Sequence, residues 1–223
     1  MLRQPEPELM DDQEQALAYA QADFEVTHNT LLGHFPRVFP ELSSPRTILD
    51  LGCGPADISI RLAQLYPDCR VDAVDGAACM LHQARNRIKA AALQDRITLY
   101  LQRLPHCELP EQSYEAIVSN SLLHHLHEPQ HLWSTVRKYA SNRTAIFICD
   151  LYRPASAAQA HVLVSRYAAG EPDILRRDFY NSLLAAFTPN EVREQLDRAG
   201  LESLQLEQVS DRHMLVHGYL QQP

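Results

Sequence analysis

Short apolar runs alternate with longer amphipathic stretches through the middle of the chain. The apolar runs have the length and composition of buried strands. They lie at residues 47–51, 70–74, 97–101, 115–120 and 144–150. Apolar residues at helical spacing occupy most of the intervals, over about 56–65, 77–92 and 130–139. Because alternating strands and helices form a parallel sheet covered on both faces, the pattern predicts a doubly wound α/β fold.

The N-terminal part does not follow this alternation. Residues from about 11 to 35 place apolar side chains at helical spacing, and prolines follow at positions 36 and 40. The chain then enters the first predicted strand, just before a glycine-rich turn. We therefore expect residues 1–45 to form a helical cap that closes as a lid, and residues 46–223 to form the main domain.

The last third of the chain also departs from the alternation. Residues 155–187 are largely helical, which predicts a helical insertion after the fifth strand. Thr-Pro-Asn-Glu at 188–191 is typical of a helix start, and Gly200 is typical of a helix end. Two more strand patterns, 203–209 and 213–220, flank a short turn and predict an antiparallel pair. The chain thus predicts a Rossmann-like, mostly parallel seven-stranded sheet with a C-terminal antiparallel strand pair.

A glycine-rich turn follows the first predicted strand, in the sequence ILDLGCGPAD at 48–57. Gly52 and Gly54 allow the backbone to turn tightly and to approach a ligand without a Cβ clash. Ligands of open α/β sheets bind at the carboxyl ends of the strands, where this turn lies. Asp75 ends the second strand, about 20 residues beyond the turn, where a carboxylate can accept hydrogen bonds from two ribose hydroxyls.

The residue after this turn distinguishes between classes of ligand. A dinucleotide-binding turn has a third small residue at position 57, where the pyrophosphate approaches the helix. This chain has Asp57 there, and its carboxylate would repel a pyrophosphate. The turn therefore favours a ligand with a ribose, no phosphate and a positive centre.

These segments resemble motifs I and II of the class I S-adenosylmethionine-dependent methyltransferases, in DLGCGPAD and the downstream VDAVDGAACM. YEAIVSNSLLHHLHEP at 114–129 is similar to the fourth-strand segment of that family. The resemblance covers about residues 45–150. It implies S-adenosyl-L-methionine as cofactor and S-adenosyl-L-homocysteine as its product. It also implies in-line methyl transfer, in which the protein aligns two reactants and excludes water.

The resemblance also implies a role for individual residues. Asp50 is expected to hold the amino group of the methionine part, Gly52 and Gly54 to approach that part, and Asp75 to hold the ribose hydroxyls. Many relatives have an aspartate after the third strand; this chain has Gln102, whose amide oxygen can accept the same hydrogen bond. The adenine is expected between Gly76 and Met80, and the sulfonium beside Asn120 and Ser121. The full expected cofactor-binding set is Asp50, Gly52, Cys53, Gly54, Asp75, Gly76, Met80, Gln102, Arg103, Leu104, Asn120 and Ser121.

Charge and cysteine content narrow the possible partners. The net charge of −8 disfavours a nucleic acid, whose binding uses many basic contacts. No apolar run reaches the roughly 20 residues that cross a bilayer, and the polar N-terminus does not match a secretory signal. The five cysteines are odd in number and form no C-x-x-C pair, which favours a reducing compartment. We therefore expect a cytoplasmic monomer or homodimer that acts on a small molecule.

Two groups of residues carry the expectations for the acceptor side. His124, His125 and His127 follow the fourth strand, and His125 is the expected general base if the acceptor needs one. A metal site is disfavoured there, because no Cys, Asp or Glu stands at ligand spacing. The insertion at 165–187 is rich in arginine and tyrosine, which suits an anion beside a flat apolar body. The residues expected to bind the acceptor are Tyr19, Arg166, Arg176, Arg177, Tyr180 and Asn181.

The sequence thus predicts a methyltransferase that acts on a small-molecule acceptor, and three alternatives remain open. One is a nucleotide-binding oxidoreductase, which Asp57 disfavours. Another is a cofactor-binding subunit without catalytic activity. The third is an enzyme that modifies the cofactor itself, for instance to a carboxylated form.

Overall fold

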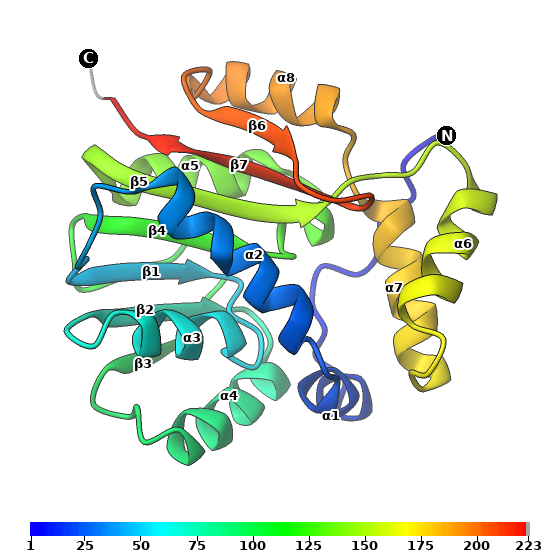
Figure 1. The fold of residues 1–223 in the computed structure, drawn as a ribbon, viewed down its shortest axis with the longest axis horizontal. Coiled ribbons are helices and arrows are strands. Elements are labelled where there is room, and N and C mark those ends of the chain that lie inside the picture. The colour runs from blue at the N-terminus through cyan, green and yellow to red at the C-terminus, as the bar shows by residue number, and fades with distance from the viewer. Residues whose placement is uncertain (222–223) are drawn as a thin grey trace.

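A seven-stranded sheet forms the centre of the protein in a computed structural model, which describes residues 1–221. The strand order is β3-β2-β1-β4-β5-β7-β6 (Figure 1). The first five strands in this order, β3, β2, β1, β4 and β5, run parallel to one another. The strands are β1 (Thr47–Leu51), β2 (Arg70–Asp75), β3 (Ile97–Leu101), β4 (Tyr114–Asn120), β5 (Ala140–Leu151), β6 (Gln205–Gln208) and β7 (His213–Tyr219). This arrangement confirms the predicted doubly wound, mostly parallel sheet.

Helices cover both faces of the sheet because successive strand residues point to opposite sides. Ile48 packs in one core cluster and the next residue, Leu49, packs in the other. The first cluster lies under α2 (Glu25–Val38), α3 (Asp57–Leu65) and α4 (Ala78–Ala90). The second lies under α5 (Gln130–Tyr139) and α8 (Pro189–Ala199). The strands, buried on both faces, therefore read as continuous apolar runs.

The C-terminal elements agree with their sequence signals. Thr188 and Glu191 form a capping box at the start of α8, with Pro189 in the first turn. The helix ends at Gly200, which has φ +65°. β7 pairs antiparallel with β6, as predicted for the two tail strands, and it also pairs antiparallel with β5. β5 begins at Ala140, four residues before the predicted start, because it also pairs with Tyr114 across a register shift.

The N-terminal helical region differs from the single predicted helix. The chain forms α1 (Gln13–Gln21) and then α2, with an interruption in which the Asp23 carboxylate accepts a hydrogen bond from the Glu25 amide. Pro36 lies inside α2 instead of ending it. Leu31 and Phe35 of α2 pack in the main core with the strands, so α2 covers the sheet. Of the expected cap, only the part before α2 lies outside the core clusters that cover the sheet.

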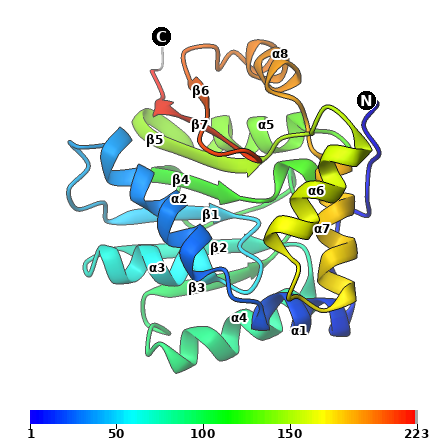
Figure 2. The same ribbon diagram turned by 45° about the vertical axis from the view of Figure 1, so that its right-hand side comes forward.

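The predicted insertion consists of two helices, α6 (Ala157–Tyr167) and α7 (Asp173–Ala185). They pack on each other through a small apolar cluster of their own, which includes Leu163 and Leu183. Together with α1 and the N-terminal segment, they stand beyond the carboxyl ends of the parallel strands (Figures 1 and 2). Among the described residues, no helix has the length and apolar character needed to cross a membrane.

Candidate active site

A cavity of about 310 Å³ opens at the carboxyl ends of the parallel strands. One part of its wall consists of the loops that follow β1, β2, β3 and β4. The other part comes from α1, the start of α2, α6, α7, the β6–β7 turn and the N-terminal segment. The location agrees with the rule that open α/β sheets bind ligands at this edge.

The glycine-rich turn forms the floor of the cavity through an unusual backbone. Gly52 and Gly54 have φ values of +73° and +51°, in the left-handed region that favours glycine. The Gly52 and Cys53 amides donate to the Val74 carbonyl at 2.8 and 3.0 Å, which holds the turn against β2. A Cβ at Gly52 would lie 2.8 Å from the Leu122 side chain. Position 52 therefore excludes a side chain for two independent reasons.

Two carboxylates flank the turn, Asp50 buried and Asp75 partly buried. The Asp75 carboxylate accepts hydrogen bonds from the Gly54 and Ala77 amides, both at 2.8 Å. The Asp50 carboxylate accepts one from the Ser59 hydroxyl at 2.5 Å. Burial raises the pKa of Asp75, and it raises the pKa of Asp50 to about 7. Both groups thus stand at the strand ends with remaining capacity to accept hydrogen bonds from a ligand.

The loops after β3 and β4 complete this half of the wall. The Gln102 amide holds its own loop: its oxygen accepts from the Glu108 amide at 2.6 Å and its nitrogen donates to the Glu108 carbonyl at 3.0 Å. The Asn120 amide donates to the Ser121 hydroxyl at 3.2 Å, and Ser121 has φ +58°. The wall includes the whole expected cofactor set: Asp50, Gly52, Cys53, Gly54, Asp75, Gly76, Met80, Gln102, Arg103, Leu104, Asn120 and Ser121.

Asp57 has a different environment from the one that the sequence argument assumed. Its carboxylate contacts His28 at 2.5 Å, Arg87 at 2.6 Å and Arg61 at 2.7 Å. Burial raises the pKa of Asp57, but hydrogen bonds from His28 and Arg61 outweigh it and leave the pKa well below its usual range. The three cationic or protonatable partners neutralise the carboxylate. Repulsion of a pyrophosphate by Asp57 is therefore a weaker argument than the sequence indicated.

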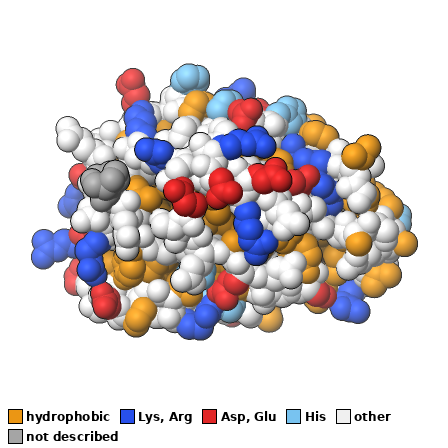
Figure 3. Space-filling model, turned by 90° about the horizontal axis from the view of Figure 1, so that it is seen from above, with side chains coloured by type: hydrophobic (Ala, Val, Ile, Leu, Met, Phe, Trp, Pro, Cys, Tyr) orange, Lys and Arg blue, Asp and Glu red, His pale blue; other side chains and the backbone are white. Residues whose placement is uncertain are grey.

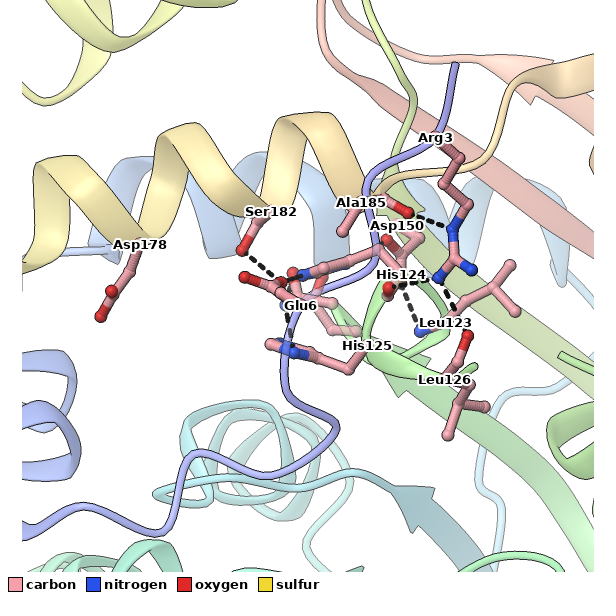
Figure 4. A network of polar contacts seen from close by, with 12 residues as sticks. Arg3, Glu6, Leu123, His124, His125, Leu126, Asp150, Asp178, Ser182 and Ala185 are labelled. Carbon is pink, nitrogen blue, oxygen red and sulfur yellow. Dashed lines mark hydrogen bonds and ion pairs between the residues drawn. The ribbon is translucent and has the colours of Figure 1, made fainter. Parts of the chain in front are cut away.

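The N-terminal segment, residues 1–12, crosses the open side of the cavity. The Arg3 guanidinium donates to the carbonyls of Ala185, His124 and Leu126 at 2.6, 2.9 and 2.9 Å (Figure 4). At the other end, the Asp11 carboxylate accepts from the Cys79 amide at 3.0 Å. The stretch between these anchors places Glu8, Leu9 and Met10 in the cavity wall. No signal in the sequence indicated this path.

The histidines after β4 meet this segment. His124 Nδ1 lies 2.6 Å from the Asp150 carboxylate, and Asp150 also accepts from the Leu123 amide at 2.7 Å. Burial lowers the pKa of His124, but the Asp150 carboxylate outweighs this effect and raises it overall. Burial and the neighbouring His124 hold the pKa of His125 well below 6.5. His124 and His125 line the cavity, whereas His127 contacts the Glu6 carbonyl outside it.

The expected acceptor-binding residues of the insertion do not line the cavity. Tyr19 of α1 does line it, as expected. The side chains of Arg166 and Arg177 are 59% and 65% exposed and pair with Asp211 and Asp178, while Arg176 pairs with Asp173. Tyr180 stacks on His161, with ring centroids 4.4 Å apart. The side chains outside the wall are Arg166, Arg176, Arg177, Tyr180 and Asn181. These side chains lie outside the wall because α6 and α7 turn their other faces toward the cavity.

Tyr167 and Arg212 occupy the place in the wall that those arginines were expected to fill. The Arg212 guanidinium lies 3.4 Å from the centroid of the Tyr167 ring, and both side chains contact the Asp211 carboxylate. The Arg212 side chain is only 12% exposed. Tyr167 falls within the arginine- and tyrosine-rich segment, but Arg212 comes from the turn between β6 and β7, for which the sequence contains no signal.

Comparisons with known proteins match this chain to methyltransferases. Residues 48–141 match the family described as a methyltransferase domain. The trans-aconitate 2-methyltransferase of Rhodococcus jostii is 33% identical over 95 residues, which are 41% of this chain and 34% of that protein. The tRNA1(Val) (adenine(37)-N6)-methyltransferase of Phocaeicola vulgatus is 38% identical over 94 residues, 42% of this chain and 38% of that protein. The chain thus spans about a third of the length of these curated relatives.

A solved structure extends the similarity to the whole fold. The SAM-dependent methyltransferase of Aquifex aeolicus superposes with a TM-score of 0.67 and 15% identity, over 93% of this chain and 98% of that one. The superposition thus covers far more of the chain than residues 48–141, the region matched by the family. The region matched by the family contains the glycine-rich turn, Asp75 and the loop after β4.

Proposed function

We propose that this chain, which carries a class I S-adenosylmethionine-dependent methyltransferase domain, transfers a methyl group from S-adenosyl-L-methionine to a small-molecule acceptor. The observation that carries the proposal is a single cavity with two different parts. The turn after β1, Asp75 and Asn120 border the part that suits the cofactor, and the N-terminal segment, α6 and α7 border the other. The two reactants would thus meet in one space, as in-line transfer requires.

Enclosure and charge support a small acceptor over an RNA. The N-terminal segment and α1 lie across the cavity, which leaves little room for a polymer. The net charge is −8, and basic and acidic side chains are interspersed on the face seen in Figure 3. A polyanion needs many basic contacts in a row. The relatives named for trans-aconitate and for tRNA match this chain over almost the same length, 95 and 94 residues, so neither name by itself decides the acceptor class.

Arg212 supports an acceptor with a carboxylate. Its guanidinium is largely buried, stacks on Tyr167 and has one carboxylate partner at 3.2 Å, so donor groups remain for a ligand. A guanidinium binds a carboxylate with two parallel hydrogen bonds, which also sets its orientation. One relative is named for methylation of trans-aconitate, a tricarboxylate. We infer from Arg212 that the acceptor here also has a carboxylate.

The chemistry rests on alignment and exclusion of water. S-adenosylmethionine supplies a methyl group already activated by positive sulfur, and a carboxylate acceptor needs no base. The low pKa of His125 makes its ring a hydrogen-bond acceptor that takes up a proton poorly at neutral pH. The role of general base, predicted for His125 from the sequence, is therefore not required by this proposal.

The proposal predicts selective binding of S-adenosylmethionine. Titration calorimetry should detect S-adenosyl-L-methionine and S-adenosyl-L-homocysteine at a stoichiometry of one per chain, and no NAD at the same concentration. The reason is that Asp75 and the turn can hold the ribose of S-adenosylmethionine, while a dinucleotide would bring two phosphate charges into a cavity whose wall already includes the carboxyl groups of Asp50 and Asp75. Binding of NAD in place of S-adenosylmethionine would contradict the proposal.

Arg212 provides the test of the acceptor class. We expect Arg212→Gln to keep its affinity for S-adenosylhomocysteine and to lower kcat/KM for methyl transfer to small carboxylic acids, trans-aconitate included, by about 10- to 100-fold. Formation of S-adenosylhomocysteine measures the rate. Arg166→Gln is the matched control, since Arg166 contacts the same Asp211 but does not line the cavity. Equal rates for the two variants would place the acceptor elsewhere.

A further inference from the structure

Glu6, His124 and His125 form a compact cluster where the N-terminal segment meets the loop after β4 (Figure 4). One atom from each residue lies within 4.8 Å of the other two. Glu6 Oε1 is 3.6 Å from His124 Nε2 and 3.3 Å from His125 Nδ1. The three side chains are between 3% and 13% exposed. The cluster is therefore shielded from bulk water, although its two histidines line the cavity.

The hydrogen bonds around the cluster leave three acceptor atoms facing one another. His124 Nδ1 faces the Asp150 carboxylate at 2.6 Å, so a neutral His124 carries its proton there and presents a lone pair on Nε2. His125 Nδ1 is buried and has no hydrogen-bond partner, while the Pro7 backbone, which can only accept, contacts the same ring. The Glu6 carboxylate, when ionised, is also an acceptor. Three buried acceptors repel one another unless a proton on one of them or a cation between them offsets the repulsion.

The spacing fits a metal ion of a particular kind. Zn²⁺ binds imidazole nitrogen and carboxylate oxygen at about 2.0–2.2 Å in tetrahedral geometry, which places neighbouring ligand atoms about 3.3–3.5 Å apart. The two separations that involve Glu6, 3.3 and 3.6 Å, lie close to this value, and the three ligand atoms all lie within 4.8 Å of one another. They are long for hydrogen bonds to a charged group, which are typically about 2.7–2.9 Å.

The surroundings match those of a protein-bound metal. A metal-ligating histidine usually donates its other ring N–H to a carboxylate or a backbone carbonyl, which fixes the ring and its tautomer. Asp150 has this position for His124 and is itself held by the Leu123 amide at 2.7 Å. The Ser182 hydroxyl donates to Glu6 Oε1 at 2.9 Å and orients the third side chain.

We propose that Glu6, His124 and His125 bind one Zn²⁺ ion on the acceptor side of the cavity. Two histidines and one glutamate are a known ligand set for zinc sites that keep an open fourth position. The ion joins the N-terminal segment to the loop after β4 and so fastens that segment across the cavity. The inference goes beyond methyl transfer, because it concerns an ion that the transfer itself does not need. With the ion bound, His125 Nδ1 is a ligand, so His125 cannot act as a general base through that atom.

The test measures zinc on the full-length protein, free of any histidine tag and stripped with a chelator. We expect one equivalent of Zn²⁺ per chain by elemental analysis after dialysis, and saturable binding in competition with a chromogenic chelator. Glu6→Gln and His125→Gln should each weaken binding at least 100-fold. Asp150→Asn, which removes the charge behind His124, should weaken it about 10- to 100-fold.

His127→Gln is the matched control, because His127 lies in the same loop but outside the cluster. It should bind Zn²⁺ as the wild-type protein does. Circular dichroism identifies any variant that fails to fold, and the two ligand variants provide independent readings. Sub-stoichiometric zinc in the wild-type protein would overturn the proposal, and so would equal binding by Glu6→Gln, His125→Gln and His127→Gln. None of these readings depends on cofactor binding or methyl transfer, so this inference can fail while the proposed function stands.

Discussion

Asp75→Ala is expected to bind S-adenosyl-L-methionine more weakly by about 1.5–3 kcal/mol, the value of hydrogen bonds to a charged group. This corresponds to a factor of about 10 to 150 in the dissociation constant. The carboxylate ends β2 in the cavity wall and also accepts from the Gly54 and Ala77 amides. Its loss would remove the proposed ribose partner and loosen the glycine-rich turn at the same time. Titration calorimetry with S-adenosylmethionine measures the change.

Two variants separate these effects from a general loss of structure. Asp75→Asn keeps one carbonyl oxygen and should bind with intermediate affinity. Asp72 lies on the same strand but does not line the cavity; its carboxylate accepts a hydrogen bond from the Tyr114 hydroxyl at 2.6 Å. Asp72→Asn removes this charge outside the cavity. It should bind the cofactor as the wild-type protein does. A folded Asp75→Ala protein with unchanged affinity would show that another group holds the ribose.

Removal of residues 2–24 should leave a folded protein that retains the cofactor poorly. The two core clusters that cover the sheet contain no residue before Leu31, and α2 remains in the shortened chain. The deletion removes Leu9, Met10 and Tyr19 from the cavity wall and uncovers Met80. We expect the affinity for S-adenosylhomocysteine to fall about 10- to 100-fold. Most of this change should be a higher rate of dissociation, because a lid slows the release of a bound ligand.

Stopped-flow measurement of product release, with the melting temperature as a check on folding, tests this prediction. Point variants on α1 refine it. Tyr19→Ala should release the product faster, because Tyr19 lines the cavity. Leu17→Ala on the same helix is the matched control, since Leu17 is 44% exposed and lies outside the wall. If the shortened protein binds and releases the product as the full chain does, the N-terminal region is not a lid.

The amino-acid sequence by itself determined the sheet and the cofactor-side wall, because both depend on signals close together along the chain. Each strand is buried on both faces and therefore reads as an apolar run, as in residues 47–51. The capping box at Thr188 is complete within four residues. The glycine-rich turn and Asp75 follow strands of known direction, so their meeting at one edge of the sheet follows from the parallel order. All twelve residues that the family resemblance implied for the cofactor line the cavity.

The tertiary structure alone decided the other half of the cavity. Arg212 comes to Tyr167 because β7 returns antiparallel beside β5, and no local pattern specifies that contact. Arginines of the insertion that looked suitable in sequence point to solvent, since the packing of α6 on α7 and not composition selects the inward face. Glu6 reaches His124 and His125 because Arg3 and Asp11 fix the N-terminal segment across the cavity. No carboxylate at ligand spacing accompanies these histidines along the chain, but metal ligands need to be close only in space, where Glu6 meets them.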